Sequence, residues 1–303
     1  MGARSASWQR DPLNPCTFTW PSDQDNPDDS DLIWSMLELP AAPPQPWCDC
    51  EPGNAAGQVE VHRLQSDILR NERRVWIYTP PGYSLGGEPY DLLLLFDGLA
   101  YIDPIPTPTI LDNLLAAGRI RPMVAVILDT LDQKTRTLEL NCYRPFIDFL
   151  ANECLPWLRK QVHITSDPRR SIVGGSSSGG LAAAYVALCH PDLFGNVLSQ
   201  SGFYAWAPDI FEPADESEHE WLARQFTLQQ TKPIRLYMDV GLLETGQHFK
   251  NDPPSPRVSN RHMRIVLQAK GYDVHYVEFC GGHDYLCWRG TLADGLLALV
   301  DAR

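Results

Sequence analysis

The chain has 303 residues, 44% of them hydrophobic, and a formal net charge of −13 at pH 7. This length suits one α/β domain with an appended segment. The acidic balance argues against a nucleic-acid or anionic-membrane partner, because either would need a concentrated field of Lys and Arg. No apolar run approaches the roughly 18 residues that span a bilayer, and the N-terminus lacks the apolar stretch of a secretory signal. We therefore expect a cytoplasmic protein.

The cysteines are scattered along the chain without the paired spacing of a zinc site. Cys48 and Cys50 form the one close pair, and a single C-x-C beside prolines is typical of a loop. We expect reduced thiols, no metal and no cofactor.

Residues 1–58 differ in composition from the rest of the chain. They are rich in Pro, Asp, Ser and Trp and show no sustained hydrophobic period. We predict an irregular N-terminal arm or the remnant of an accessory domain, with one candidate short helix at residues 31–39. From Val59 the pattern becomes strand, turn, strand, so residues 59–303 are assigned to an α/β domain.

Apolar strands and amphipathic helices alternate along this second part. Strands are predicted at residues 91–98, 123–130, 170–175, 195–202, 233–241 and 274–279. Helices are predicted at residues 108–120, 146–162, 181–194, 259–272 and 290–300. Such alternation implies right-handed βαβ crossovers and a mostly parallel central sheet with helices on both faces.

A glycine-serine segment, residues 174–180 (GGSSSGG), lies between a predicted strand and a predicted helix. Only Ser177 fits the pattern G-x-S-x-G, with Gly175 and Gly179 on either side. This pattern is typical of a nucleophile elbow, in which small residues let the backbone turn sharply and lift one hydroxyl to the carboxyl edge of the sheet. The alternatives are a plain loop and a phosphate-binding loop, although no Lys follows the glycines. We predict an α/β-hydrolase fold with Ser177 as nucleophile.

A serine hydroxyl needs a base, and Gly281-Gly282-His283-Asp284 follows the last predicted strand. We predict His283 as the general base, with a surface loop His as the alternative. The chain order Ser, acid, His then requires a carboxylate between the two. Asp239 and Glu244 both qualify. We prefer Glu244, because a loop carboxylate can reach the far imidazole nitrogen and fix its tautomer.

Two backbone amides are predicted to form an oxyanion hole. The Ser178 amide begins the helix after the nucleophile, and the Leu99 amide lies in the loop after an early strand. Four further side chains are candidates for a pocket that holds an aromatic or anionic acyl group. They are Arg136, Trp206, Tyr285 and Trp288. Packing in the core is the alternative interpretation for a Trp.

Several segments carry a family resemblance: RRVWIYTPPGY, LLLLFDG, RTLELNC, GGSSSGGLAAAYVALCHPDLFGNVLSQSG and GGHDYLCWRGTLADGL. They resemble the catalytic domain of the enterochelin (enterobactin) esterases, siderophore trilactone hydrolases among the esterase D-like α/β-hydrolases. The resemblance runs over residues 59–296, and GGHD-x-x-CWRG is its most specific motif. It implies a serine esterase that hydrolyses ferric catecholate trilactones. Ser177, Glu244 and His283 match the family's catalytic positions, and Arg136 matches a residue that engages the catecholate.

The chain departs from that family in two places. Members usually carry a larger N-terminal domain, where this chain has about 60 irregular residues, and they commonly have an aromatic residue where this chain has Ser178. The expected partner is a small-molecule ester, with a ferric siderophore as the candidate. A general carboxylesterase or feruloyl-type esterase is the alternative enzyme, and a binding protein that captures an aromatic ligand without turnover is the alternative of another class.

Overall fold

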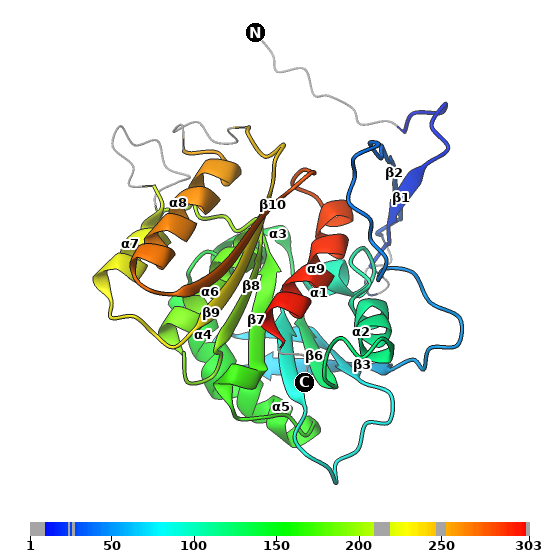
Figure 1. Ribbon diagram of the computed structural model, residues 1–303. Coiled ribbons are helices and arrows are strands. Elements are labelled where there is room, and N and C mark those ends of the chain that lie inside the picture. Colours follow the sequence, from blue (N-terminus) through cyan, green and yellow to red (C-terminus); the bar gives the residue numbers. More distant parts are fainter. Residues whose placement is uncertain (1–9, 24, 26–27, 209–218, 247–252, 301–303) are drawn as a thin grey trace. The chain divides into compact units, whose positions relative to one another are not determined.

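The strands beyond residue 57 form one eight-stranded sheet in the order β10-β9-β8-β7-β5-β6-β4-β3 (Figure 1). The structure is a computed structural model and describes residues 10–23, 25, 28–208, 219–246 and 253–300. The strands are β3 Gln58–Ser66, β4 Asn71–Thr79, β5 Asp91–Leu95, β6 Met123–Leu128, β7 Ser171–Ser176, β8 Asn196–Gln200, β9 Arg235–Gly241 and β10 Asp273–Phe279. Strands β3 and β4 are antiparallel to their neighbours, and the other six pair in parallel. The mostly parallel sheet predicted from the sequence is confirmed.

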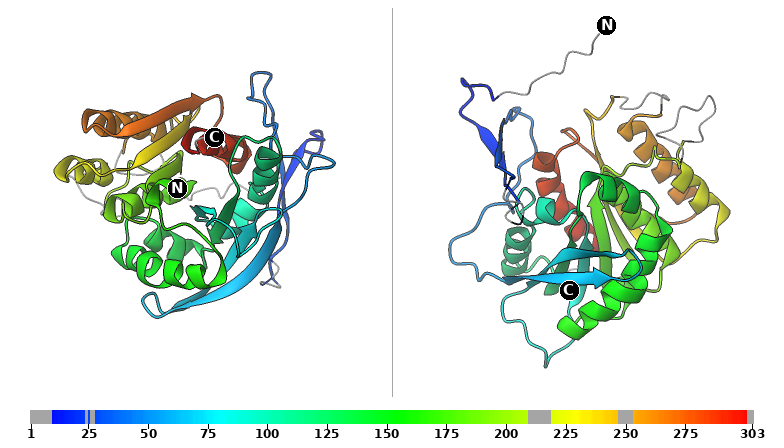
Figure 2. Two further views of the ribbon diagram at one scale, coloured as in Figure 1. Left: turned by 60° about the horizontal axis from the view of Figure 1, so that its bottom comes forward. Right: turned by 180° about the vertical axis from the view of Figure 1, so that it is seen from behind.

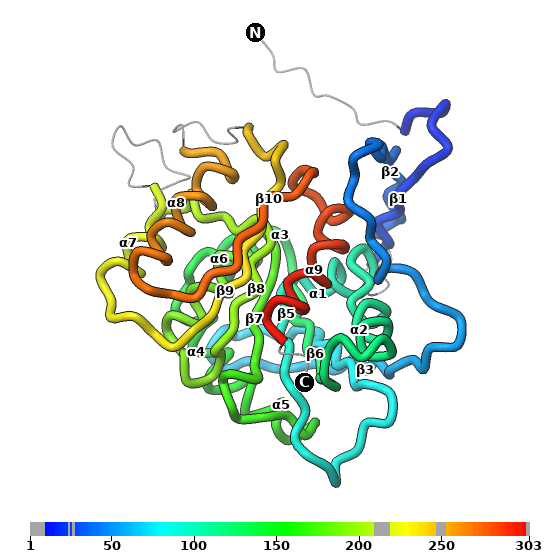
Figure 3. The backbone as a smooth tube through the Cα atoms, viewed as in Figure 1, coloured from blue at the N-terminus to red at the C-terminus, as the bar shows by residue number. Residues whose placement is uncertain are grey.

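The centre of the sheet is apolar because both of its faces are covered. Every residue of β5 and β6 is buried, in agreement with their unbroken apolar sequences. Strand β5 lies between β6 and β7, as the backbone trace in Figure 3 shows. The chain therefore leaves β5 to one side for β6 and returns to the other side for β7. Such a switch opens a crevice at the carboxyl ends of the strands, where ligands of α/β proteins bind.

Helices form a layer on each face of the sheet. They are α1 Gly98–Ile102, α2 Thr107–Ala116, α3 Gln133–Glu139, α4 Arg144–Phe149, α5 Leu155–Gln161, α6 Ser178–Cys189, α7 Trp221–Leu228, α8 Pro256–Ala269 and α9 Tyr285–Leu299. One core contains Leu181 of α6 and Met263 of α8, and the second contains Ile110 of α2 and Leu292 of α9. In Figure 2 the light-blue β3–β4 hairpin and the orange β10 lie at opposite edges of the sheet.

The helix predicted over residues 146–162 forms with an interruption. A π-helical turn, η1 Leu150–Cys154, separates α4 from α5. Pro156 has no N–H to donate and its ring crowds the preceding turn, which accounts for the local widening. The patterns in the sequence do not predict α1, α3 and α7, because helices this short show little periodicity. In the part of the chain that the structure describes, no helix has the length and apolar character to cross a membrane.

Residues Met1–Ala42 form a unit separate from Pro43–Arg303. In its described part, β1 Thr17–Trp20 pairs antiparallel with β2 Leu32–Ser35. The short helix predicted at residues 31–39 is therefore wrong. Ile and Trp favour extended backbone, and one isolated helical turn carries a nucleation penalty that cross-strand pairing avoids.

Candidate active site

Ser177 occupies a sharp turn between β7 and α6. Its φ of 56° and ψ of −118° lie in a region that L-residues rarely adopt, and such backbone costs about 1–3 kcal/mol. The Ser177 N–H donates to the Gln200 carbonyl at 2.9 Å, and the Ser177 carbonyl accepts from the Phe203 N–H at 2.9 Å. The end of β8 and the segment after it therefore hold the strained turn in place.

Glycines let α6 approach β7 closely at this turn. A Cβ on Gly175 would lie 2.9 Å from the backbone of Gly179, and a Cβ on Gly180 would lie 2.6 Å from Ser199 Oγ. By contrast, the nearest atom to a Cβ on Gly179 would be Asp97 Oδ2 at 3.5 Å. Close packing of helix on strand thus requires glycine at 175 and 180, and Gly179 matters mainly because its backbone comes so near.

The acid and the imidazole come from the loops after β9 and β10. His283 Nδ1 lies 2.6 Å from Glu244 Oε2. A carboxylate only accepts, so Nδ1 carries the proton and Nε2 remains to receive one from a nucleophile. Glu244 is buried, whereas the His283 side chain is 34% exposed and lines the same pocket as Ser177. The structure therefore gathers all three predicted triad residues at the carboxyl edge of the sheet.

Asp239, the alternative acid, lies deeper in β9. It is fully buried, and its Oδ1 accepts from the Ser201 N–H at 3.1 Å. Burial raises the pKa of Asp239 to about 7, and the nearby charge of Glu244 adds to the rise. The structure thus brings Glu244, and not Asp239, to the imidazole.

The two candidate oxyanion amides both lie at helix N-termini. Ser178 is the first residue of α6 and lines the pocket. Leu99 is the second residue of α1, and Gly98 before it is required because a Cβ there would overlap the Trp76 ring. The first amides of a helix have no acceptor within the helix, so both can donate to a developing oxyanion. Among the described residues, the pocket lining includes Ser178 but not Leu99.

A pocket of about 400 Å³ opens beside Ser177. Its polar wall comes from α3 and the residues after it, and its apolar wall comes from the segments around Phe203 and the prolines before α8. The described lining residues besides Ser177, Ser178 and His283 are Gln133, Arg136, Thr137, Asn141, Phe203, Ala205, Gly246, Pro253, Pro254 and Pro256. One polar and one apolar wall suit an acyl group with an aromatic face and polar substituents.

Arg136 lines this pocket but is also paired within the protein. Its Nε and one terminal nitrogen donate to the two Asp97 carboxylate oxygens at 2.6 and 2.7 Å. Burial lowers the pKa of Arg136 and Asp97 raises it, with a net result above its ordinary value. Asp97 has a φ of 63° and precedes α1. Arg136 therefore fastens the loop that carries the Leu99 amide.

The three aromatic candidates are not among the described residues that line the pocket. Trp206 is 8% exposed and packs edge-on against Trp221 in the core. Trp288 is 3% exposed, its ring lies edge-on to His283 at 4.8 Å, and its Nε1 donates to Ser201 Oγ at 3.0 Å. Tyr285 packs edge-on against Trp288 at 5.1 Å. Trp288 thus packs against the imidazole, and Tyr285 packs against Trp288, near enough to Asp97 and Arg136 for their charges to act on its pKa.

Two residues beside the triad have no counterpart among the sequence predictions. Ser201 donates from Oγ to Glu244 Oε1 at 2.6 Å, and Asp97 receives Arg136. A weak signal for both exists in the sequence, because each is the second-last residue of a predicted apolar strand, in FDG and SQSG. Polar residues at the carboxyl ends of parallel strands meet at one edge, but their spacing along the chain does not indicate which of them touch.

Comparisons with known proteins identify relatives of this chain. Residues 66–299 match the family described as putative esterase. The iron(III) enterobactin esterase of Dickeya dadantii is 33% identical over 302 residues, which covers 95% of this chain and 66% of that protein. The enterobactin esterase of Shigella flexneri, solved in the presence of enterobactin, matches with a TM-score of 0.78 at 29% identity, over 96% of this chain and 68% of that one. A ferulic acid esterase of Anaeromyces mucronatus, 20% identical with a TM-score of 0.66 over 86% of this chain and 97% of that one, shares the fold.

The chain spans slightly less than two thirds of the curated relatives' length, 66% for the Dickeya dadantii protein and 62% for the iron(III) enterobactin esterase of Escherichia coli K12. The family match itself extends from the end of β3 to the end of α9 and so includes every strand of the sheet after β3. The resemblance to enterobactin esterases and the α/β-hydrolase fold expected from the sequence are confirmed. The chain belongs to the putative esterase family.

Proposed function

We propose that this protein is a serine esterase that hydrolyses the ester bonds of a catecholate siderophore trilactone of the ferric enterobactin type. The observation that carries the proposal is the 2.6 Å contact of His283 Nδ1 with Glu244 Oε2, because His283 lines the same pocket as Ser177, which occupies a strained turn. Relatives named iron(III) enterobactin esterase support the substrate class. We assign catalysis to residues 59–303 and expect the enzyme to act in the cytoplasm.

The proposed chemistry is acyl transfer through an acyl-enzyme. His283 Nε2 takes the proton of the Ser177 hydroxyl as its oxygen attacks the ester carbonyl, and the Ser178 amide donates to the oxyanion that forms. The imidazolium then protonates the leaving alkoxide, and Glu244 stabilises the charged ring while this occurs. Water attacks the acyl-enzyme by the reverse sequence, releasing the acid and restoring the Ser177 hydroxyl.

A simpler aryl ester is the second candidate substrate. The pocket of about 400 Å³ has an apolar wall that includes Phe203, Pro253 and Pro254, so one aromatic acyl arm can occupy it without contacts from a larger macrocycle. This fit is the observation that supports a general or feruloyl-type esterase as the second candidate.

A hydrolysis panel separates the two. Purified protein is given a catecholate trilactone with and without bound iron, a feruloyl ester and a short nitrophenyl ester, and the products are identified by mass spectrometry. We expect kcat/KM for the trilactone to exceed that for the nitrophenyl ester by about 100-fold or more, since remote contacts contribute to transition-state binding. Equal or faster turnover of the feruloyl ester would favour the second candidate, and no turnover of any ester would reject both.

A further inference from the structure

A continuous chain of hydrogen bonds runs behind the acid. Trp288 Nε1 donates to Ser201 Oγ at 3.0 Å, and Ser201 Oγ donates to Glu244 Oε1 at 2.6 Å. The other oxygen, Glu244 Oε2, faces His283 Nδ1 at 2.6 Å. One end of this chain is an indole that can only donate and the other end is the imidazole, so the direction of each hydrogen bond is fixed.

Because its members are buried, this series of hydrogen bonds determines the orientation of the Glu244 carboxylate. Ser201 is 0%, Trp288 3% and Glu244 4% exposed. Glu244 Oε1 also accepts from the Gly241 N–H at 2.7 Å. With two donors on Oε1, rotation of the carboxylate would leave buried N–H and O–H groups unsatisfied, which costs about 1–3 kcal/mol for each group. Oε2 is thereby kept toward the imidazole.

Ser201 has a strained backbone conformation that directs its hydroxyl toward Glu244. Its φ is 47°, a conformation that glycine favours and serine seldom adopts. Its N–H lies 3.0 Å from the Asp239 carbonyl and 3.1 Å from Asp239 Oδ1. The strained residue is anchored from below by β9, and its side chain points to the acid. Strained residues of this kind cluster where a side chain must be aimed.

Trp288 contacts the base directly and reaches the acid through Ser201. Its N–H reaches Ser201, and its ring packs edge-on against His283 with centroids 4.8 Å apart at 81°. The indole thus supports the imidazole from behind while it fixes the hydroxyl that holds Glu244. Trp288 was a candidate for substrate contact from the sequence, and its burial gives it a different place.

We propose that Ser201 and Trp288 are positioning residues that hold Glu244, and through it the orientation and tautomer of His283. This inference rests on the proposed esterase function. Neither residue touches the reacting atoms. Their effect is on the pre-organisation of the base, so they should alter kcat and leave KM nearly unchanged.

The test compares Ser201→Ala and Trp288→Phe with the unchanged enzyme on a nitrophenyl ester. Alanine keeps the Cβ and hence the backbone strain of Ser201, so the first variant removes only the hydroxyl. Phenylalanine keeps an aromatic ring and removes the N–H. We expect kcat to fall about 10- to 100-fold for Ser201→Ala and about 10-fold for Trp288→Phe, with KM within about twofold.

Two controls separate positioning from loss of stability. In a Glu244→Ala background, Ser201→Ala should change kcat by less than about twofold, because the residue acts through a carboxylate that is gone. Tyr204→Phe removes another buried hydrogen bond near this edge, from Tyr204 to Ser199 at 2.8 Å, and should leave kcat unchanged. An equal loss from Ser201→Ala in both backgrounds, or full kcat in the single variant, would overturn the proposal.

A readout without turnover keeps this inference distinct from the proposed function. In protein with ¹⁵N-labelled histidine, the Nδ1 proton of His283 bonded to Glu244 should give a low-field resonance in the unchanged chain. We expect that signal to weaken or vanish in Ser201→Ala and to persist in Tyr204→Phe. If the His283 signal is unchanged in Ser201→Ala, the positioning role is rejected, whether or not any ester is hydrolysed. If the signal is lost in Ser201→Ala but the unchanged protein hydrolyses no ester, only the proposed function is rejected.

Discussion

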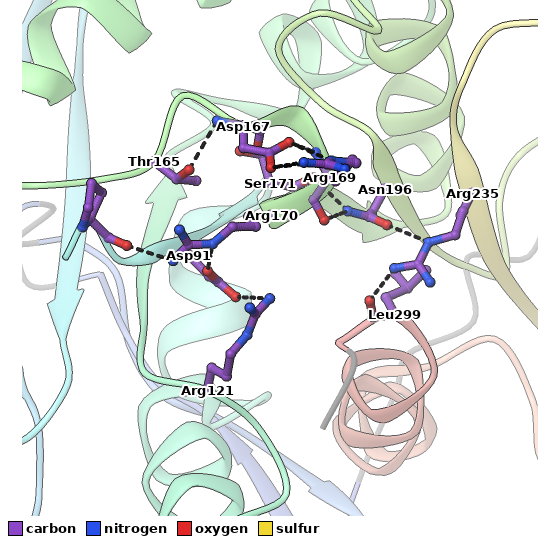
Figure 4. A network of polar contacts seen from close by, with 11 residues as sticks. Asp91, Arg121, Thr165, Asp167, Arg169, Arg170, Ser171, Asn196, Arg235 and Leu299 are labelled. Carbon is purple, nitrogen blue, oxygen red and sulfur yellow. Dashed lines mark hydrogen bonds and ion pairs between the residues drawn. The ribbon is translucent and has the colours of Figure 1, made fainter. Parts of the chain in front are cut away.

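The amino and carboxyl ends of the parallel strands, here called the amino edge and the carboxyl edge of the sheet, differ in how buried charged side chains are paired. At the amino edge, Asp91 lies 2.6 Å from Arg170 and 3.0 Å from Arg121 (Figure 4). Arg235 closes the same edge by donating to the Leu299 carbonyl at the end of α9, at 2.6 Å. Each of these contacts ties one strand to a neighbouring segment, and the arginines neutralise the buried carboxylate.

At the carboxyl edge, the buried carboxylate of Glu244 is held by neutral donors and by the imidazole of His283. Three residues with positive φ, Asp97, Ser177 and Ser201, come just after β5, β7 and β8. The strained backbone of these three residues and the buried carboxylate of Glu244, which has no arginine partner, both lower the stability of the fold. The strain orients side chains, and the carboxylate activates the imidazole. The comparison teaches that polar residues serve closure at the amino edge, whereas at the carboxyl edge one closing pair, Arg136 with Asp97, lies beside groups that serve reactivity.

The strongest test of this contrast removes the nucleophile. Ser177→Ala should reduce kcat for any ester by about 10⁴-fold or more, because the triad acts as a unit. Labelling by a fluorophosphonate should disappear with it. Ser176→Ala is the control, since Ser176 is fully buried and is not among the described residues that line the pocket. Activity that survives Ser177→Ala would place the nucleophile elsewhere.

The second test compares the two buried acids. Glu244→Ala should reduce kcat about 10³-fold, less than loss of the serine, because it leaves the nucleophile and the oxyanion donors in place. Asp239→Asn keeps the shape and an oxygen for the Ser201 N–H, so kcat should fall less than about tenfold. Steady-state kinetics on one nitrophenyl ester measures both. A larger loss from Asp239→Asn would reverse the assignment of the acid.

Much of this arrangement is predictable from the sequence. The unbroken apolar strands and the G-x-S-x-G turn predict a parallel sheet with a serine at its carboxyl edge, because periodicity and glycine spacing are local properties. His283 follows from the order of the chain, which leaves both Asp239 and Glu244 as candidate acids, and the preference for Glu244 follows from the need for a loop carboxylate.

The remaining features depend on contacts between distant segments. Trp288 pairs with Ser201 across 87 positions, and Arg136 with Asp97 across 39. No pattern in the chain encodes which polar groups meet at an edge. The sequence predicts a helix where strand β2 forms for the same reason, because pairing with β1 decides its conformation.

Asp239 makes the free energy of unfolding depend on pH. Its raised folded pKa of about 7 exceeds the unfolded value near 3.8, so the folded chain keeps a proton that the unfolded chain has lost. The contribution of this proton to the free energy of unfolding is fully present below the unfolded pKa. It is lost as the pH rises from about 4 to 7, and the loss amounts to up to about 4 kcal/mol. Asp239→Asn should remove the slope. Urea unfolding at several pH values measures it, and identical slopes would contradict the burial argument.

Arg136→Ala should affect catalysis through the loop before α1. With Asp97 released, the Leu99 amide loses its support, and we expect kcat/KM to fall about 10- to 100-fold for both a neutral nitrophenyl ester and a catecholate ester. Arg136→Lys should recover little, because a lysine cannot make the two parallel hydrogen bonds. If only KM for the catecholate rises, Arg136 serves the substrate and not the loop.

The smallest effect is expected at the amino edge. Arg170→Ala leaves Asp91 with Arg121, and both arginines are partly exposed, so the free energy of unfolding should fall by only about 1–2 kcal/mol. Because this edge serves closure alone, kcat/KM at 25 °C should not change, and Arg121→Ala should behave in the same way. Urea titration and nitrophenyl ester kinetics on the same samples measure both quantities. A fall in kcat beyond about threefold in fully folded Arg170→Ala would show that the two edges are coupled, since no residue of the pocket touches this network directly in the described part of the chain.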